Sequence, residues 1–158
     1  MSSNKQPNNN TTSENPVGRF MVATGGIFEL NNSRNILIIQ RASHLDWHPN
    51  EWEIMYGRID QFEDVESGLK RESKEELGLR DFEIIDISNV WHKFRGTEKI
   101  AQNDCIGITY WCRVTSPEVK LNSEHQSYKW VTPEEALSFI KIDGIREDII
   151  KFIQLRDK

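Results

Sequence analysis

The sequence GRIDQFEDVESGLKRESKEELGL, which runs from Gly57 to Leu79, is the most informative part of this chain. Its segment from Asp64 to Leu77 contains no proline and is rich in Glu, Lys and Leu, which favour a helix. Gly78 follows directly, and glycine is the residue type that most often ends a helix. The pattern therefore predicts a helix over 64–77.

Three carboxylates lie on one side of this predicted helix. At about 100° per residue, Glu72, Glu75 and Glu76 share an arc that overlaps the face carrying Val65 and Leu69. A solvated face of Glu–Lys pairs is the ordinary interpretation of a Glu-rich helix, but acids on the inward face do not fit it. Clustered, partly desolvated carboxylates need a compensating charge. The pattern therefore favours a site for a hard divalent cation, Mg²⁺ or Mn²⁺.

The same residues resemble the Nudix box, a family motif written G-x5-E-x7-R-E-U-x-E-E-x-G-U, in which U is aliphatic. The one departure is Ser73, which stands where an aliphatic residue is usual. Fixed residue types at fixed spacing make this signal far more specific than a lone glycine motif. The matching residues are Gly57, Glu63, Arg71, Glu72, Glu75, Glu76, Gly78 and Leu79.

The resemblance implies an α/β fold of the Nudix type, which is an α/β/α sandwich with a mixed central β-sheet. It also implies an enzyme in which water attacks a phosphorus of a nucleoside diphosphate linked to another group, with Mg²⁺ or Mn²⁺ as the cofactor. By position in the motif, Glu72, Glu75 and Glu76 are the expected catalytic and metal-binding side chains. The backbone carbonyl of Tyr56 is expected to join the coordination. Which glutamate orients or deprotonates the water stays open.

Gly57, Glu63 and Arg71 are expected to support this site. A charge-assisted hydrogen bond between Glu63 and Arg71 would hold the loop and the helix together. Gly57 should either adopt a backbone conformation closed to other residues or pack too tightly for a Cβ. Many family members begin the box with Pro-Gly-Gly, whereas Tyr56 and Arg58 flank the glycine here. Arg58 is therefore a candidate for a substrate phosphate contact, with a surface residue paired to an acid as an equal alternative.

Residues outside the box offer further candidates, each with a structural alternative. Glu124 and His125 lie where several family members place an additional acid that serves as a base or metal ligand, so Glu124 is a further candidate at the substrate, although a polar surface loop explains both residues equally well. Aromatic residues on strands could stack on a base, but core packing explains them more often. The remaining candidates are His44, Trp47, His48, Trp91, Phe94 and Trp111, together with Arg19, Arg41 and Arg95 for phosphate contact.

The chain has 158 residues and a formal net charge of −5, with a pI of about 5.4. This length suits one domain, and the acidic balance provides no basic field for nucleic acid. No apolar run approaches the roughly 20 residues of a membrane-spanning helix, and no secretory signal is visible. We therefore expect a cytoplasmic protein without nucleic-acid or membrane partners. Residues 1–16 should be a disordered tail and residues 17–158 a single domain.

The rest of the chain predicts a mixed sheet with helices packed on it. Gly25-Gly26 suggests a bulge or a close backbone approach in the first strand. Thr132-Pro133 has the residue types of a helix start, and apolar spacing over Ile145–Leu155 predicts a C-terminal helix. The expected strands are Phe20–Leu30 and Ile36–Arg41, paired as a hairpin, then Trp52–Met55, Phe82–Trp91, Ile106–Val114 and Tyr128–Val131.

Cys105 and Cys112 share one predicted strand, in which they would be roughly 23 Å apart and on opposite faces. They are too distant for a disulfide and are expected to be buried thiols. A diphosphate isomerase of the same superfamily needs a catalytic cysteine, and these two give that alternative little support. A catalytically silent ligand-sensing or regulatory Nudix module usually lacks box acids, all of which are present here. An active hydrolase is favoured; its nucleotide substrate and its oligomeric state, with a homodimer as one option, stay open.

Overall fold

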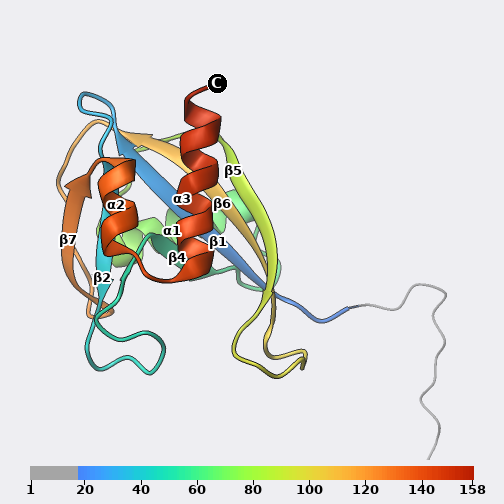
Figure 1. The fold of residues 1–158 in the computed structure, drawn as a ribbon. Coiled ribbons are helices and arrows are strands. Elements are labelled where there is room, and N and C mark those ends of the chain that lie inside the picture. The colour runs from blue at the N-terminus through green and yellow to red at the C-terminus, as the bar shows by residue number, and fades with distance from the viewer. Residues whose placement is uncertain (1–17) are drawn as a thin grey trace, which may run out of the picture.

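This computed structural model describes residues 18–158, so the disordered tail expected over residues 1–16 lies outside the described residues. Residues 18–158 form seven strands and three helices (Figure 1). The strands are β1 (Met21–Leu30), β2 (Ile36–Arg41), β3 (Trp52–Glu53), β4 (Met55–Arg58), β5 (Glu83–Phe94), β6 (Asp104–Val114) and β7 (His125–Val131). The helices are α1 (Val65–Leu77), α2 (Pro133–Phe139) and α3 (Asp143–Arg156).

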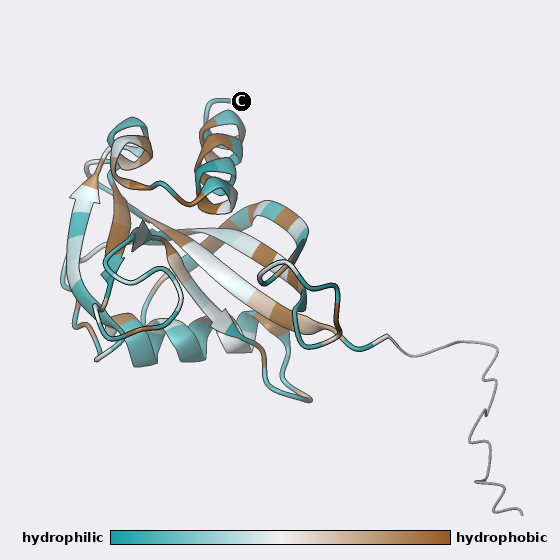
Figure 2. Cartoon of the chain, turned by 60° about the horizontal axis from the view of Figure 1, so that its bottom comes forward, coloured by the Kyte–Doolittle hydropathy of each residue, from teal (hydrophilic) through white to brown (hydrophobic). Residues whose placement is uncertain are grey.

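The described strands join one mixed sheet. Its order is β3-β2-β1-β6-β5, with β4 pairing to β1 and β7 pairing to β2. β1 and β6 run parallel, from Met21 opposite Cys105 to Leu30 opposite Val114, whereas the other described pairs are antiparallel. Figure 2 shows α1 on one face of the sheet and α2 with α3 on the other. The predicted α/β/α sandwich with a mixed central sheet is therefore confirmed.

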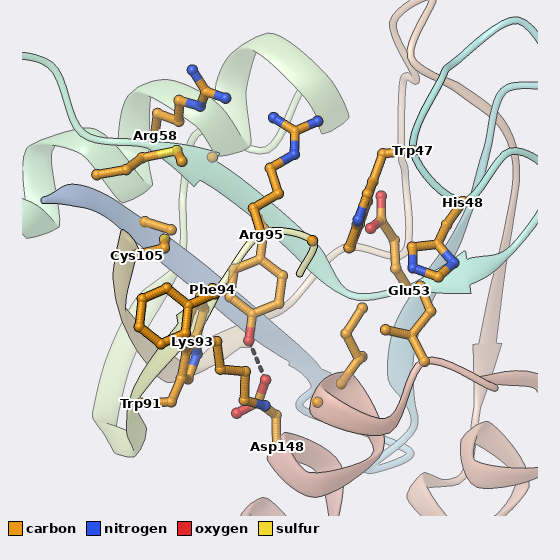
Figure 3. Close-up of a pocket in the computed structure, with 18 of the residues that line it drawn as sticks. Trp47, His48, Glu53, Arg58, Trp91, Lys93, Phe94, Arg95, Cys105 and Asp148 are labelled. Atoms are coloured by element: carbon orange, nitrogen blue, oxygen red, sulfur yellow. Dashed lines mark hydrogen bonds between the residues drawn. The ribbon is translucent and has the colours of Figure 1, made fainter. Parts of the chain in front are cut away.

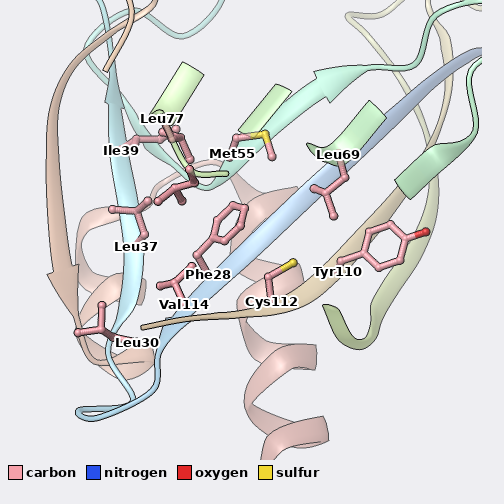
Figure 4. Packing of buried hydrophobic residues seen from close by; sticks show 11 residues of the cluster. Phe28, Leu30, Leu37, Ile39, Met55, Leu69, Leu77, Tyr110, Cys112 and Val114 are labelled. Carbon is pink, nitrogen blue, oxygen red and sulfur yellow. The ribbon is translucent and has the colours of Figure 1, made fainter. Parts of the chain in front are cut away.

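Alternating strand side chains build a separate apolar core on each face of the sheet. In the core shown in Figure 4, Phe28 and Cys112 pack with Leu69 of α1. The other core joins Ile27 of the same β1 strand to Ile149 of α3. Successive strand residues point to opposite faces, so β1 supplies both cores in turn. This packing holds α1, with its glutamates, against the sheet.

Helix α1 begins and ends within one residue of the limits that its capping residues predicted. α1 begins at Val65 after Asp64, whose carboxylate accepts a hydrogen bond of 3.0 Å from the backbone N–H of Ser67. Gly78 ends the helix in the left-handed conformation at φ 68°, as expected. Thr132 caps α2 through a complete capping box. These boundaries depend on neighbouring residues, which is why the sequence predicted them.

Other boundaries differ from the prediction. The strand expected over Trp52–Met55 is two strands, because β3 pairs with β2 and β4 pairs with β1. β5 and β6 extend to Phe94 and back to Asp104, since their ladder continues beyond the apolar residues. Cys105 and Cys112 are buried free thiols, as predicted. No helix in the described part of the chain is long and apolar enough to cross a membrane.

Candidate functional site

Helix α1 carries the three predicted glutamates, and the fold buries them unequally. Glu76 is only 5% exposed, and the side chain of Glu72 is 14% exposed. The side chain of Glu75 is 55% exposed. Glu72 and Glu76 therefore face inward, as the helical arc predicted, while Glu75 lies at the solvent edge of the group.

Glu76 occupies an unfavourable environment for a charge. Its Oε2 atom is buried and has no hydrogen-bond partner. Burial raises the pKa of Glu76 to about 9, and the nearby charges of Glu124, Glu72 and Glu53 add to this rise. A buried carboxyl group with a free oxygen, surrounded by other acids, is a position that a cation would stabilise.

Arg71 connects the loop of the box to helix α1. Its guanidinium donates to both carboxylate oxygens of Glu63, at 2.8 and 2.9 Å, and to Oε1 of Glu72 at 2.7 Å. It also donates to the backbone carbonyl of Arg58 at 2.9 Å. Hydrogen bonding to Arg71 lowers the pKa of Glu63 to about 2. The contact expected between Glu63 and Arg71 is therefore present.

Gly57 packs directly against the side chain of Glu72. A Cβ added at Gly57 would lie 2.1 Å from Cγ and 2.3 Å from Cδ of Glu72. Among residues 18–158, the glycines with positive φ are Gly78 and Gly96. Of the two alternatives expected at Gly57, tight packing is the one that the structure shows. Gly57 lies in the extended strand β4, so the contact with α1 alone excludes a side chain.

A second group of charged side chains lies beside Glu76. Nε2 of His125 lies 3.0 Å from Oε1 of Glu53, and its Nδ1 lies 4.0 Å from Oε2 of Glu76. Arg41 donates to the same oxygen of Glu53 at 3.1 Å. The fold thus buries His125 and leaves Glu124 exposed, so the surface-loop interpretation is wrong for His125. As the side chains stand, no three His, Cys, Asp or Glu residues within 18–158 are grouped closely enough to hold a metal ion.

A pocket of about 460 Å³ opens beside the box, between the sheet and α3 (Figure 3). Its lining includes Tyr56 and Gly57. The lining does not include Glu72, Glu75 and Glu76, nor the candidates Arg19, His44, Trp111, Glu124 and His125. Trp111 packs edge-on against Phe152, with 5.6 Å between ring centroids, so core packing is its role. The sequence candidates that do line the pocket are Arg41, Trp47, His48, Arg58, Trp91, Phe94 and Arg95.

Two buried acids at this site, Glu53 and Asp148, were missed by the sequence analysis. Asp148 is 2% exposed and lies on α3 between the buried residues Ile145 and Ile149. The sequence did contain a signal for Asp148, because it lies at helical spacing from apolar residues of the same predicted helix. The same signal marked Glu76. Glu53 had a weaker signal, since a single acid in a short strand is common on an exposed face.

Comparison with known proteins agrees with this arrangement. The family model of the NUDIX domain matches residues 19–155. The chain belongs to the Nudix hydrolase family. Among its curated relatives, the nucleoside triphosphatase NudI of Escherichia coli strain K12 is 30% identical over 118 residues, which cover 70% of this chain and 82% of NudI. The family resemblance inferred from the Nudix box is therefore confirmed over residues 19–155 of this protein.

Solved structures show the same architecture. The MutT protein of Methanosarcina mazei Go1 superposes with a TM-score of 0.73 at 20% identity, covering 91% of this Nudix chain and all (100%) of that chain. An Ap4A hydrolase of C. elegans superposes with a TM-score of 0.69 at 21% identity, covering 87% and 98%. At these identities the similarity establishes the fold, which is that of a Nudix domain.

Proposed function

We propose that this chain is an active, metal-dependent Nudix hydrolase that cleaves the diphosphate linkage of a nucleoside diphosphate joined to another group. The observation that carries the proposal is Glu76, a buried carboxyl group with an unpartnered oxygen beside Glu72. Burying such a group costs stability unless a cation compensates it. The alternative, a catalytically silent sensing module, usually lacks one or more of the box acids, all of which are present here.

The donor groups around Glu76 are of the chemical type that a hard divalent cation, Mg²⁺ or Mn²⁺, prefers, and their side chains would have to draw together to hold one. Such cations prefer carboxylate and carbonyl oxygens, so Glu72, Glu75 and Glu76 would supply carboxylates, and the backbone carbonyl of Tyr56 is expected to join them. When bound, the cation would neutralise phosphate charge and lower the pKa of the attacking water. The residues that would hold it are thus those of the box, although Glu124 lies close enough to influence Glu76.

The chain's own residues prepare the site in two ways. Arg71 holds Glu72 and the box loop in a fixed relation through its bonds to Glu63 and to the backbone of Arg58. Gly57 lets strand β4 approach Glu72 closely. We assign these residues a positioning role, because fixed donor groups lose little freedom when a substrate binds.

The pocket beside the box suits a nucleotide. It is lined by aromatic residues that can stack on a base and by Arg58 and Arg95, whose guanidinium groups match phosphate. Similarity to a nucleoside triphosphatase makes nucleoside triphosphates the first substrates to test. Nucleotide sugars, ADP-ribose and dinucleotides follow as further members of the same chemical class.

The test is a hydrolysis screen with matched variants. Purified protein with Mg²⁺ or Mn²⁺ is expected to release phosphate or pyrophosphate from at least one nucleotide, and excess EDTA should stop the reaction. Glu75→Gln and Glu76→Gln should lower turnover by about 10²-fold or more, because each removes a charge at the reacting group. Glu66→Gln, the same change at an exposed residue of α1, should keep turnover. Turnover undiminished by EDTA, or no turnover of any nucleotide, would contradict the proposal.

We also propose that residues 17–158 are sufficient as a single catalytic domain. The family match spans 19–155, and the described sheet begins at Met21. A chain that starts at Val17 should keep the melting temperature and kcat of the full chain. A fall of more than a few degrees would show that the removed segment stabilises the domain.

A further inference from the structure

The side chain of Tyr56 crosses strand β1 on the α3 face of the sheet. Tyr56 of β4 lies opposite Gly25 of β1, and Gly25 lies opposite Thr109 of β6, so the three residues form one row. A Cβ added at Gly25 would lie 2.3 Å from Cε1 of Tyr56. The close approach expected at Gly25 is thus confirmed, and the β1 ladder continues through it without a bulge. Because Gly25 has no side chain, the tyrosine hydroxyl reaches Thr109, where the two hydroxyl oxygens are 2.8 Å apart.

The hydroxyl of Tyr56 is anchored on helix α3. It donates to Oδ2 of Asp148, as the dashed line in Figure 3 shows. Oδ1 of Asp148 accepts from Nδ2 of Asn89 at 2.6 Å, and Nζ of Lys151 donates to Oδ1 of Asn89 at 2.9 Å. Both carboxylate oxygens of Asp148 therefore have donors within the protein, and the residue is 2% exposed. Asp148 is thus an internal acceptor that holds Tyr56 in place.

The backbone carbonyl of Tyr56 points to the edge of β4 that faces helix α1. The backbone N–H of Ile59 donates to the carbonyl of Val22 on β1 at 2.9 Å. Because antiparallel strands alternate hydrogen-bonded and non-hydrogen-bonded pairs, Tyr56 and Arg58 turn their carbonyls away from β1. The carbonyl of Arg58 accepts from Nη2 of Arg71 on α1 at 2.9 Å, which agrees with this direction. The Tyr56 carbonyl therefore lies along the same edge as the box residues of α1.

Strand β4 is held only weakly by its own ladder. It has four residues, and within residues 18–158 it pairs on one edge, with β1. So short a strand, paired on one edge, makes few backbone hydrogen bonds. Gly57 packs against Glu72 on the α1 face, and Tyr56 is bonded to Asp148 on the α3 face. Successive strand residues point to opposite faces, so these two contacts hold the strand from both sides.

We propose that Tyr56 and Asp148 are positioning residues for the metal site, acting from the opposite face of the sheet. The bond between their side chains fixes the rotation of Tyr56 about strand β4, and with it the direction of the carbonyl that would bind the cation. Burying a carboxylate costs free energy, and an apolar pair would fill the same space without this cost, so the bond contributes a fixed direction. The inference rests on the proposed function, in which the Tyr56 carbonyl joins the glutamates of the box.

Manganese binding to the nucleotide-free protein tests this inference. Mn²⁺ is titrated into the metal-free full chain, and the free ion is followed by electron paramagnetic resonance. Tyr56→Phe keeps the ring over Gly25 and removes only the hydroxyl, and it should weaken Mn²⁺ binding by about tenfold or more, as loss of a group that orients a metal ligand commonly does. Tyr110 is a second buried tyrosine, in the core on the α1 side. Tyr110→Phe is therefore the matched control and should keep the affinity of the wild type.

A double-mutant cycle separates positioning from general stability. If Asp148 acts through the Tyr56 hydroxyl, Asp148→Ala and the double variant should bind Mn²⁺ about as weakly as Tyr56→Phe does. Melting temperatures in EDTA report how much each change destabilises the fold. A contact that only stabilised the fold would lower these temperatures and leave the Mn²⁺ affinity of the folded protein unchanged.

The outcomes separate this inference from the proposed hydrolysis. Equal Mn²⁺ affinity of the wild type and Tyr56→Phe, an equal loss in Tyr110→Phe, or additive losses in the double variant would overturn the positioning role and leave the proposed hydrolysis standing. Absence of Mn²⁺ binding by the wild type would overturn both. The expected losses of Mn²⁺ affinity in a protein that hydrolyses no nucleotide would uphold the positioning role and contradict the enzymatic proposal.

Discussion

Replacing Glu76 by Gln is expected to stabilise the metal-free protein while it removes catalysis. Burial raises the pKa of Glu76 from its usual 4.5 to about 9. At pH 7 the unfolded chain releases this proton, whereas the folded protein retains it. At about 1.4 kcal/mol per pKa unit, this difference lowers the free energy of unfolding by roughly 3 kcal/mol relative to its value at low pH. Because the pKa of Glu76 is raised in the folded state, its protonated carboxyl contributes its full stability below about pH 4.5, and this contribution is lost as the pH rises toward about 9.

Urea denaturation in the presence of EDTA measures this effect. Between pH 5 and pH 8, the wild type should lose on the order of 4 kcal/mol of unfolding free energy relative to Glu76→Gln. Glutamine has nearly the same volume and no titrating proton, so the variant lacks this loss. Saturating Mg²⁺ should then stabilise the wild type more than the variant, since only the wild type keeps all of the acids. A difference that stays constant across this pH range would refute the reasoning that Glu76 is held in an unfavourable environment.

Three further perturbations probe the surrounding residues. Gly57→Ala puts a methyl group about where Glu72 lies, so urea melts should show a loss of about 1–3 kcal/mol, accompanied by lower turnover. Arg58→Ala should lower kcat/KM by about tenfold or more without changing metal affinity if its guanidinium contacts phosphate; unchanged kcat/KM would leave it a surface residue. The pKa of Glu63 is lowered from the usual 4.5 to about 2, so its ionised carboxylate stabilises the folded state. This stabilisation is complete above about pH 4.5 and is lost as the pH falls toward about 2. Thermal melts should therefore show the advantage of the wild type over Glu63→Gln shrinking across that window, and a constant advantage would argue against it.

The residues between Gly57 and Leu79 were sufficient by themselves to predict the limits of helix α1, the inward direction of Glu76 and the family. Helix limits at Asp64 and Gly78 follow from capping, which involves residues within one turn. The inward direction of Glu76 follows from helical periodicity. When a helix buries its apolar face, an acid that lies within that face is buried as well. The box identified the family for the same reason, since its spacing is a local property of the chain.

Tertiary structure alone decided which groups meet. Tyr56 and Asp148 are 92 residues apart in sequence, and they meet because β4 pairs with β1 while α3 packs across the sheet. His125 reaches Glu53 through the pairing of β7 and β3 with β2. Sequence periodicity tells which side of an element is buried, but it does not tell which other element covers that side. Sheet order, register and the close approaches permitted by glycine supply that information, and with it the pocket.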